Sequence, residues 1–384
     1  MTKTDKILHI CSNYISTKLF PNLLFESNKI FRNNYLFCPI KKHYKKSKYS
    51  YLNSEDSILK ANADYVKIEK CYSKFDTLLF YPKRSKIFKK VKKSYNLNDY
   101  EAIMAHSLFT DGWVARKLFL KFGLPYCVFV QNSDINVFLK KFFFLRKYAL
   151  KILEDARKIV FCSETVKKNV FDKYLPATMH NAVEQKTVII PFGIENTFFD
   201  DMPKAGDIDI SKSINVVTVG SIDENKNQIA VACAIDKLIK EKMLDVKYVL
   251  AGNIVEQACL DKLLKYPFVN YLGTKNYDEL KKIYADSDIF ALTSRHETFG
   301  LVYAEAMTRG LPLIYSRGQG FDGQFADGEV GYAVNCDDID EIASALEKII
   351  SEYAKLSKNA LEGSLNFKWD KVARAYHGAI ICSE

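Results

Sequence analysis

The sequence predicts an α/β protein built from two domains, each with a parallel sheet. The chain has 384 residues, and at about 150 residues per domain this length suggests two. Short apolar runs alternate with helical patterns, which is typical of parallel sheets covered by helices. The alternation stops at residues 200–213, which carry Pro, Gly and acidic residues without a period, and then restarts. We interpret residues 200–213 as a linker.

In the first half, apolar runs bounded by turn residues predict the strands, and amphipathic stretches predict the helices. The expected strands are Ile7–Cys11, Tyr35–Ile40, Thr77–Tyr81, Ala102–His106, Tyr126–Val130, Lys158–Cys162 and Val188–Pro191. The expected helices are Lys83–Lys93, Trp113–Phe122, Val137–Leu153 and Glu164–Tyr174.

The second half repeats this alternation. The expected strands are Asn215–Gly220, Val246–Gly252, Val269–Gly273, Asp288–Thr293 and Pro312–Tyr315. The expected helices are Asn227–Lys240, Val255–Leu264, Tyr277–Ala285, Val302–Arg309 and Ile339–Ser351. We therefore expect one Rossmann-like domain over residues 1–200 and another over 201–366. A helix within 367–384 is expected to return to the first domain.

Composition excludes several classes of protein. Apolar residues make up 48% and charged residues 27%, as in ordinary globular proteins. No apolar stretch approaches the length of a membrane span, and the polar start predicts no signal peptide. The nine cysteines are scattered and form no Cys-x-x-Cys pair, which favours a reducing cytoplasm over disulfides or a zinc site.

The densest signal for function is the segment from residue 285 to residue 314. It has the pattern of a buried strand, a loop, a helix that begins after Gly300, and a second strand. Glycine allows close approach to a ligand, and unpaired amides at a helix start suit a phosphate. Glu297 and Glu305 stand eight residues apart, and carboxylates can accept hydrogen bonds from sugar hydroxyls. The spacing alone is easily a coincidence, whereas the whole segment is not.

This segment resembles the retaining glycosyltransferases of family 4, which have the two-domain GT-B fold. Their Glu-x7-Glu motif is matched by Glu297 and Glu305, within Glu297-Thr-Phe-Gly-Leu-Val-Tyr-Ala-Glu-Ala306. Three further segments are similar to the family's patterns. They are Pro191-Phe-Gly-Ile-Glu-Asn-Thr-Phe198, Val219-Gly-Ser-Ile-Asp-Glu-Asn-Lys-Asn227 and Asp327-Gly-Glu-Val-Gly-Tyr-Ala-Val334.

The resemblance implies a metal-independent transfer from a nucleotide-sugar, with a UDP-sugar as the expected donor and no cofactor. Glu297 would contact the transferred sugar, and His106 is a second catalytic candidate, although a strand-end histidine is as often structural. The leaving phosphate would accept the acceptor's proton. The implied donor-binding positions are Lys226, Ser221, Phe299, Gly300, Leu301, Val302, Glu305 and Asn276, and the acceptor-side candidates are Gln131 and Asn132.

The chain departs from the family at three places. Ser221 stands where an arginine usually follows the glycine of the phosphate strand, and a missing guanidinium weakens charge stabilisation. Residues 11–18 contain no glycine, and Gln131 follows a strand where many members have histidine. Ser221 and the missing glycine motivate one alternative, a catalytically silent subunit that supports an active partner. A further alternative is another enzyme of the GT-B fold, such as a nucleotide-sugar epimerase.

Three Asp-x-Asp sequences also occur, and such a pair holds a metal in other glycosyltransferases. They are Asp207/Asp209, Asp286/Asp288 and Asp338/Asp340. Each lies at a linker, a strand entry or a helix start, where aspartate commonly forms a turn or caps a helix. We therefore expect no metal site.

Charge divides unevenly between the halves. Residues 1–200 hold 35 Lys and Arg against 18 Asp and Glu, a net charge of +17, whereas the remainder carries −7. The basic runs Lys41–Lys48, Lys83–Lys93 and Lys140–Lys151 contribute, the last interleaved with aromatic residues. Such a surface suits an anionic membrane, and no nucleic-acid motif accompanies it. We expect a cytoplasmic protein, peripheral on the inner face of the membrane. The resemblance to family 4 implies a glycan or lipid-linked acceptor in bacterial surface polysaccharide synthesis.

Overall fold

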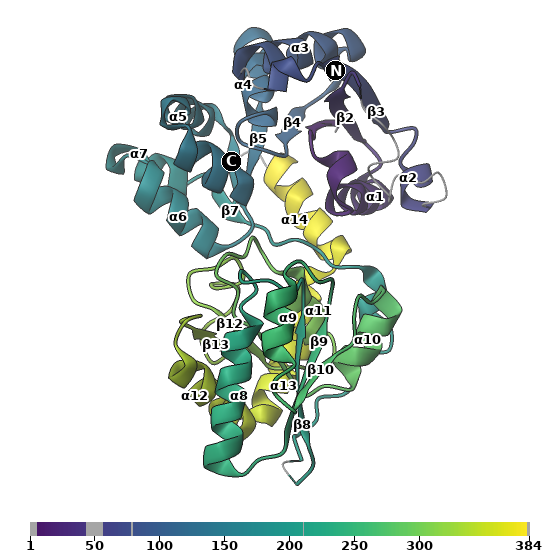
Figure 1. The fold of residues 1–384 in the computed structure, drawn as a ribbon. Helices are drawn as coiled ribbons and strands as arrows, with labels where there is room; N and C mark the ends of the chain where they lie inside the picture. The colour runs from purple at the N-terminus through teal and green to yellow at the C-terminus, as the bar shows by residue number, and fades with distance from the viewer. Residues whose placement is uncertain (1–5, 44–56, 78–79, 210, 382–384) are drawn as a thin grey trace. The chain divides into compact units, whose positions relative to one another are not determined.

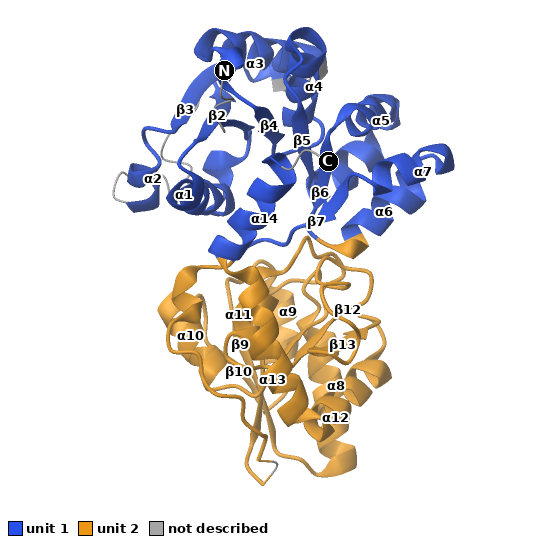
Figure 2. Cartoon of the chain, turned by 180° about the vertical axis from the view of Figure 1, so that it is seen from behind, with its two compact units in different colours: residues 1–162, 166–193, 369–384 blue, residues 163–165, 194–368 orange. Residues whose placement is uncertain are grey.

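The chain divides into two compact units, which Figures 1 and 2 show in a computed structural model. The structure describes residues 6–43, 57–77, 80–209 and 211–381. The first unit comprises residues 1–162, 166–193 and 369–384, and the second comprises 163–165 and 194–368. The chain thus crosses between units at residue 193, earlier than the predicted boundary at residue 200.

The first unit contains a seven-stranded sheet in which all the strands are parallel. Its strand order is β3-β2-β1-β4-β5-β6-β7. The strands are β1 Ile7–Ile10, β2 Asn34–Lys41, β3 Val66–Tyr72, β4 Ala102–Ala105, β5 Tyr126–Val130, β6 Lys158–Phe161 and β7 Thr187–Ile189.

Helices connect these strands, as parallel pairing requires. For example, α4 (Asp111–Phe122) ends where Gly123 adopts a left-handed conformation (φ 70°) and its N–H bonds to the Phe119 carbonyl. The others are α1 Leu19–Phe31, α2 Ser57–Ala61, α3 Phe80–Ser94, α5 Arg146–Asp155, α6 Glu164–Tyr174, α7 Ala177–Glu184 and α14 Trp369–Ile381.

The second unit repeats the plan with six parallel strands in the order β10-β9-β8-β11-β12-β13. The strands are β8 Ile214–Val219, β9 Val246–Ala251, β10 Val269–Tyr271, β11 Ile289–Leu292, β12 Leu313–Ser316 and β13 Gly331–Val334. The helices are α8 Gln228–Lys242, α9 Gln257–Leu263, α10 Tyr277–Ala285, α11 Leu301–Met307, α12 Ile339–Ser351 and α13 Tyr353–Ser364.

The second sheet therefore has the order 3-2-1-4-5-6 of a Rossmann fold, and the first has the same order with a seventh strand, β7, beside the sixth. The predicted fold class is confirmed. In such a sheet the second and third strands lie on one side of the first strand, and the fourth and later strands lie on its other side. In open α/β sheets, ligands bind at this switch point, beyond the carboxyl ends of the strands. The loops after β1 and β4, and those after β8 and β11, occupy these places.

Burial explains why the central strands are continuous apolar runs. Every residue of β1, β4, β5, β11 and β12 is buried, because helices cover both faces of each sheet. Apolar side chains of α8 and α12 complete the core of the second unit, among them Val231, Ile235 and Leu346.

Several predicted elements of the first unit are wrong. In place of a strand at Thr77–Tyr81, a 3₁₀ turn covers Phe75–Thr77 and α3 begins at Phe80, while residues 78–79 lie outside the described part. The edge strand is instead β3, whose polar, largely exposed pattern gives a weak signal. The single helix predicted at Val137–Leu153 is a π-helix (Asp134–Leu139), a 3₁₀ turn (Phe143–Leu145) and α5.

The sequence also failed to predict α1, α2, α7, α13 and β13. Among the described residues, further 3₁₀ turns cover Tyr14–Ser16, Leu97–Asp99, Asn196–Phe199 and Leu365–Phe367. None of the helices in the described part of the chain combines the length and apolarity that a bilayer crossing needs.

The helix predicted at Trp369–Ile381, α14, lies in the first unit, where it packs on α1, β4 and β5 (Figure 1). His377 stacks on Phe31 with ring centroids 3.4 Å apart, and Tyr376 is buried beside Phe129. Trp369, at the start of the helix, is 2% exposed and lies directly over Gly193. The start of α14 therefore depends on the absence of a side chain at residue 193.

We expect Gly193→Ala to destabilise the first unit by about 1–3 kcal/mol, the usual cost of overpacking. A Cβ at this position would lie 2.4 Å from the Trp369 ring. Thermal unfolding of the variant measures this loss. Gly378→Ala is the matched control, because nothing lies within 4 Å of its added Cβ and alanine favours a helix. Equal midpoints for the two variants would contradict the packing described.

Candidate active site

Asn225 joins the two loops at the switch point of the second unit. Its side-chain amide donates to the His296 carbonyl (3.0 Å), and its side-chain oxygen accepts from the His296 N–H (3.0 Å). Its own carbonyl accepts from the Arg295 N–H at 2.8 Å. The loop after β8 and the loop after β11 are therefore one hydrogen-bonded structure. His296 contributes its backbone to it.

Asp223 shapes the loop after β8. One carboxylate oxygen accepts from the hydroxyl of Ser221 and the other accepts from the backbone N–H of Lys226 at 2.8 Å. The Ser221 carbonyl accepts from the side-chain amide of Gln228 at 2.7 Å. Ser221 therefore helps to fold the loop and offers no positive charge.

This loop directs Lys226 toward the predicted catalytic glutamate. Lys226 Nζ lies 2.6 Å from Glu297 Oε2, and the two side chains are only 19% and 12% exposed. Ser294 donates to the same oxygen at 3.4 Å, and the Thr298 N–H donates to Glu297 Oε1 at 3.0 Å. The structure thus brings together two residues that stand 71 positions apart in the chain.

The backbone of Glu297 is fixed from a third loop, which follows β12. Its N–H donates to the side-chain oxygen of Gln319 (3.0 Å), and its carbonyl accepts from the Gly320 N–H (3.2 Å). A Cβ at Gly320 would lie 2.1 Å from the Thr298 carbonyl oxygen, so only glycine permits this approach. Gly300, at φ 81°, then turns the chain into α11.

Glu305 occupies a different environment, inside α11. Glu305 is only 7% exposed, and the hydroxyl of Tyr284 donates a hydrogen bond to Glu305 Oε2 at 3.2 Å. Burial raises the pKa of Glu305 to about 7, against the opposing effect of the Tyr284 hydrogen bond. The two glutamates of the motif therefore share a sequence pattern but have different partners.

The remaining donor-side candidates lie in different environments. The Phe299 ring is buried against Phe321 and Phe367, so its side chain belongs to the core. Leu301 and Val302 begin α11 and are partly exposed, but this helix has only seven residues, too few for its dipole alone to define a phosphate site. Asn276 caps α10 in a reciprocal capping box with Glu279, which favours a structural role.

In the first unit, His106 is buried, with 1% exposure. Its Nε2 lies 2.9 Å from Nδ1 of His9, whose other ring nitrogen lies 3.1 Å from the Asn34 side-chain oxygen. Burial lowers the pKa of His9 to about 4 and holds the pKa of His106 well below its usual value. This environment favours the structural alternative for His106 over the predicted catalytic role.

The acceptor-side candidates follow β5. The Gln131 amide donates to the His106 carbonyl and its oxygen accepts from Asn13 at 3.1 Å, so Gln131 joins the loops after β1, β4 and β5. Asn132 is partly exposed beside it. The adjacent Asp134 is buried and accepts the N–H groups of Leu108, at 2.9 Å, and of Gln131, at 3.0 Å.

Several residues that organise these strand-end edges were not predicted from the sequence. In the first unit, buried Asp111 accepts from the Ser12 backbone N–H and hydroxyl and from Ser107. Burial raises the pKa of both Asp111 and Asp134 to about 6. In the second unit the missed organisers are Asp223, Asn225 and Gln319. Asp111 is the first residue of α4, six residues after the end of β4, and no spacing in the sequence pairs it with Ser12.

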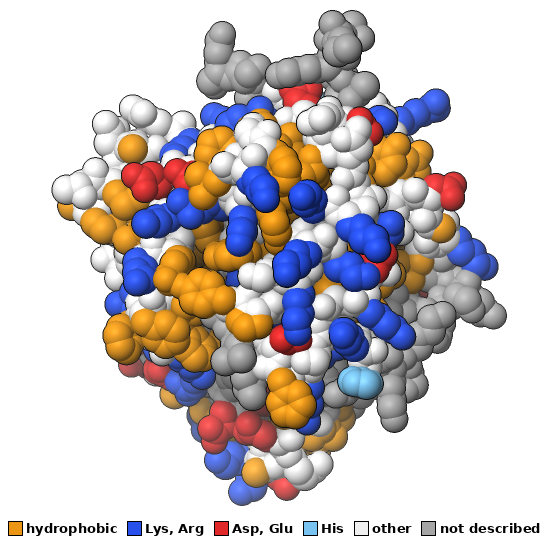
Figure 3. Space-filling view, turned by 90° about the horizontal axis from the view of Figure 1, so that it is seen from above, with side chains coloured by type: hydrophobic (Ala, Val, Ile, Leu, Met, Phe, Trp, Pro, Cys, Tyr) orange, Lys and Arg blue, Asp and Glu red, His pale blue; other side chains and the backbone are white. Residues whose placement is uncertain are grey.

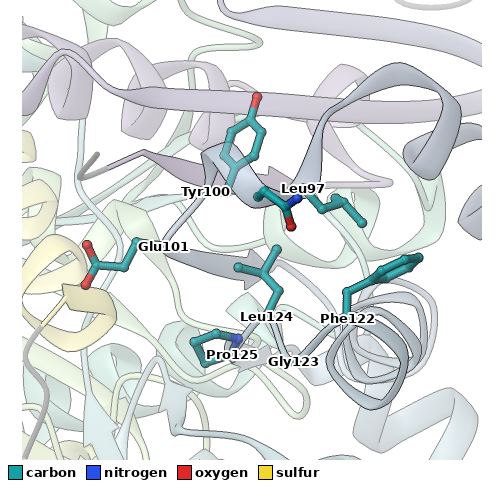
Figure 4. A pocket seen from close by; sticks show the side chains of 8 residues that line it. Leu97, Tyr100, Glu101, Phe122, Gly123, Leu124 and Pro125 are labelled. Atoms are coloured by element: carbon teal, nitrogen blue, oxygen red, sulfur yellow. The ribbon is translucent and has the colours of Figure 1, made fainter. Parts of the chain in front are cut away.

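A pocket of about 230 Å³ lies elsewhere in the first unit (Figure 4). Its lining residues precede β4 and β5, so it opens at the amino ends of these strands. Ligands of such sheets bind at the carboxyl ends, and this pocket is therefore not the candidate site. It is lined by Leu97, Asn98, Tyr100, Glu101, Phe122, Gly123, Leu124 and Pro125.

The Asp-x-Asp residues have structural partners. Asp288 accepts from the Asn215 N–H at 2.7 Å, and Asp338 caps α12 by accepting from the Glu341 N–H at 3.0 Å. Asp209 accepts from the N–H of Ser211. Across the described ranges, no group of three or more His, Cys, Asp and Glu residues is placed to hold a metal ion.

Comparison with solved structures identifies the fold as GT-B. Anabaena Alr3699/HepE in complex with UDP aligns with a TM-score of 0.68 at 17% identity, over 97% of this chain and 98% of that one. Sucrose-phosphate synthase from Thermosynechococcus elongatus gives the same TM-score and identity, over 97% of each chain. The fold is thus GT-B-like, with two Rossmann-like domains.

Residues 206–363 match the sequence model of the family "Glycosyl transferases group 1", so the similarity to that family lies in the second unit. Sulfoquinovosyl transferase SQD2 of Arabidopsis thaliana is 28% identical over 139 residues, 35% of this chain and 27% of that protein. An uncharacterized glycosyltransferase of Methanocaldococcus jannaschii, MJ1607, is 25% identical over 237 residues, 57% and 58% of the two chains. These matches span only part of each relative's length.

The buried Glu305 predicts a pH-dependent contribution to stability. Because folding raises its pKa from 4.5 to about 7, the folded protein retains this proton more tightly than the unfolded chain. The resulting stabilisation is full below pH 4.5 and is lost as pH rises through 7, by at most about 3 kcal/mol.

Glu305→Gln lacks this titration but keeps an acceptor for Tyr284. We therefore expect the thermal midpoint of the wild type to fall relative to that of the variant between pH 4.5 and 7.5. Thermal unfolding of both proteins across this range is the measurement. A constant difference between the two midpoints would mean that Glu305 does not titrate there.

Proposed function

We propose that this protein is a retaining, metal-independent glycosyltransferase. It transfers a sugar from a nucleotide-sugar to a glycan or a lipid-linked acceptor. The bond between the anomeric carbon and the leaving phosphate breaks, and the acceptor oxygen bonds to the same face of that carbon. The acceptor's proton passes to the leaving phosphate. Retention and metal independence rest on the resemblance to family 4.

The Lys226–Glu297 pair carries the proposal. These two side chains meet at the switch point of the second unit, inside the region that matches the group 1 family. Lys226 supplies positive charge for a diphosphate, and Glu297 supplies acceptors for sugar hydroxyls. Glu305 is the proposed partner of the ribose. UDP is the proposed nucleotide because a structural neighbour was solved with UDP.

The first unit is proposed to receive the acceptor. Gln131 and Asn132 lie at the carboxyl edge of its sheet, where such a domain binds ligands. A lipid-linked or glycan acceptor in bacterial surface polysaccharide synthesis fits the resemblance.

We also propose that the protein acts in the cytoplasm, peripherally on the inner face of the membrane. Phe143 is 73% exposed and Phe144 is 54% exposed, between the π-helix and α5, and Lys140 and Lys141 beside them are exposed. Figure 3 shows lysine and arginine side chains gathered on one face together with exposed hydrophobic ones. Exposed aromatic residues among lysines suit the interface of an anionic membrane.

One observation favours a second candidate, a catalytically silent subunit that supports an active partner. Ser221 replaces the usual arginine, and its hydroxyl is used within the loop by Asp223. A silent subunit would bind no nucleotide, or would bind it without transfer. Nucleotide binding and turnover therefore distinguish the two candidates.

We expect Lys226→Ala and Glu305→Ala to weaken nucleotide-sugar binding by about tenfold or more, because each loses a hydrogen bond that involves charge. Glu297→Ala should lower turnover by about 100-fold with a smaller effect on binding, because its proposed contact is with the reacting sugar. Calorimetry identifies the nucleotide among UDP, GDP, ADP and dTDP, each with EDTA and with magnesium. Binding and single-turnover assays then compare the variants.

Lys237→Ala is the matched control, because Lys237 on α8 pairs with Asp340 on the helix surface. It should leave donor binding unchanged. Wild-type binding in both Lys226→Ala and Glu305→Ala would remove the site from the second unit's switch point. Failure of the unaltered protein to bind any of the four nucleotides would favour the silent subunit.

For the membrane, we expect the double variant Phe143→Ser/Phe144→Ser to bind anionic vesicles about tenfold more weakly, since two large apolar side chains no longer leave water. Vesicle co-sedimentation at low salt measures this change. Leu264→Ser, at a 52% exposed position of the second unit, is the control and should bind as the wild type does. No binding by the wild type, or equal binding by all three proteins, would contradict the proposed surface.

A further inference from the structure

In the candidate site, the two charged side chains proposed to bind the donor are paired with each other. Lys226 Nζ lies 2.6 Å from Glu297 Oε2, and both side chains are largely removed from water. Glu297 also accepts from Ser294 and from the Thr298 N–H. The proposed donor contacts of both residues are therefore already engaged with each other.

The other cations on the strand-end loops of this unit have different counterions. Arg295 pairs with Asp337, Lys275 with Glu279 and Arg317 with Glu341. Lys226 differs from these three cations because its counterion is itself the proposed contact of the transferred sugar. With Ser221 in place of arginine, a diphosphate at this loop depends strongly on Lys226. The diphosphate must then compete with the Glu297 carboxylate for the ammonium group of Lys226.

Glu297 cannot follow Lys226 easily. Its N–H and carbonyl are held by Gln319 and Gly320, and its carboxylate accepts a hydrogen bond from the Thr298 N–H at 3.0 Å. The side chain of Lys226, in contrast, passes beside Gly220, and its ammonium group is carried on a flexible four-carbon stem. Any exchange of partners is therefore a movement of the lysine away from a fixed carboxylate.

We infer that donor binding exchanges this ion pair, and that the exchange lets the site distinguish an intact nucleotide-sugar from a nucleoside diphosphate. This inference rests on the proposed function. The diphosphate takes Lys226, which leaves the Glu297 carboxylate without its cation and beside a new negative charge. The hydroxyl groups of the sugar then donate hydrogen bonds to that carboxylate.

A nucleoside diphosphate lacks those hydroxyls. When it takes Lys226, it leaves the largely buried Glu297 carboxylate uncompensated, which is costly. The site therefore disfavours the product of transfer relative to the donor, and the restored Lys226–Glu297 pair accompanies product release. Glu297 thus has a positioning role toward Lys226 in addition to its proposed contact with the sugar.

The test compares UDP with UDP-glucose, or the corresponding pair for the base that the nucleotide panel selects. Calorimetry measures both affinities for the wild type and for Glu297→Gln. The variant should bind the diphosphate about three- to fivefold more tightly, because Lys226 is no longer held by a charged partner. Its affinity for the nucleotide-sugar should stay the same or fall, so the preference for the intact donor shrinks.

A double-mutant cycle with Lys226→Ala attributes the gain to the exchange. In the Lys226→Ala background, Glu297→Gln should give no gain in diphosphate affinity. A gain that persists there reflects the general loss of negative charge and overturns the inference. Asp340→Asn, which breaks a surface pair of the same unit, is the charge-matched control and should leave both affinities unchanged.

Unchanged or weaker diphosphate binding by Glu297→Gln overturns the inference while the proposed function stands. Absence of nucleotide binding in the wild type overturns the proposed function instead. Glu297→Ala repeats the comparison if the glutamine variant unfolds at a lower temperature than the wild type. The same gain is expected in it, and its absence counts equally against the exchange.

Discussion

Hydrogen bonds between the loops that follow the first and fourth strands hold together the edge of each sheet where the candidate residues lie. In the first unit, Asp111 accepts from Ser12 across this edge, and in the second unit Asn225 bonds to His296. Both bonds cross the switch point, where the strand order reverses. Without them the two loops would diverge, because the chain leaves the sheet in opposite directions there.

A site residue could be predicted from the sequence when the residues it acts with are close to it in the chain. Glu297, Gly300 and Glu305 belong to one short segment, so their pattern is visible in the chain. Asp223 acts within a short loop, but Asn225 and Gln319 act on residues 71 and 22 positions away, and no spacing predicts such bonds.

The same reasoning explains the errors in the first unit. The edge strand β3 is exposed to solvent and lacks an apolar run, whereas the segment after Asp134 has an amphipathic pattern without being one helix. Hydrophobic periodicity indicates which face of a segment is buried, but it does not indicate where a helix is interrupted. His106 ends a buried strand as predicted, but only packing shows that its ring contacts His9 and Phe20 within the core.

The return of α14 has a consequence for synthesis on the ribosome. Residues 194–368 form the second unit, and α14 follows them, so the first unit leaves the ribosome first and is completed last. Until residues 369–381 emerge, the surfaces of α1, β4 and β5 that α14 covers stay open to water. All the strands and helices of the second unit precede residue 369, so this unit can be completed before the first, and the order of completion is the reverse of the order of translation.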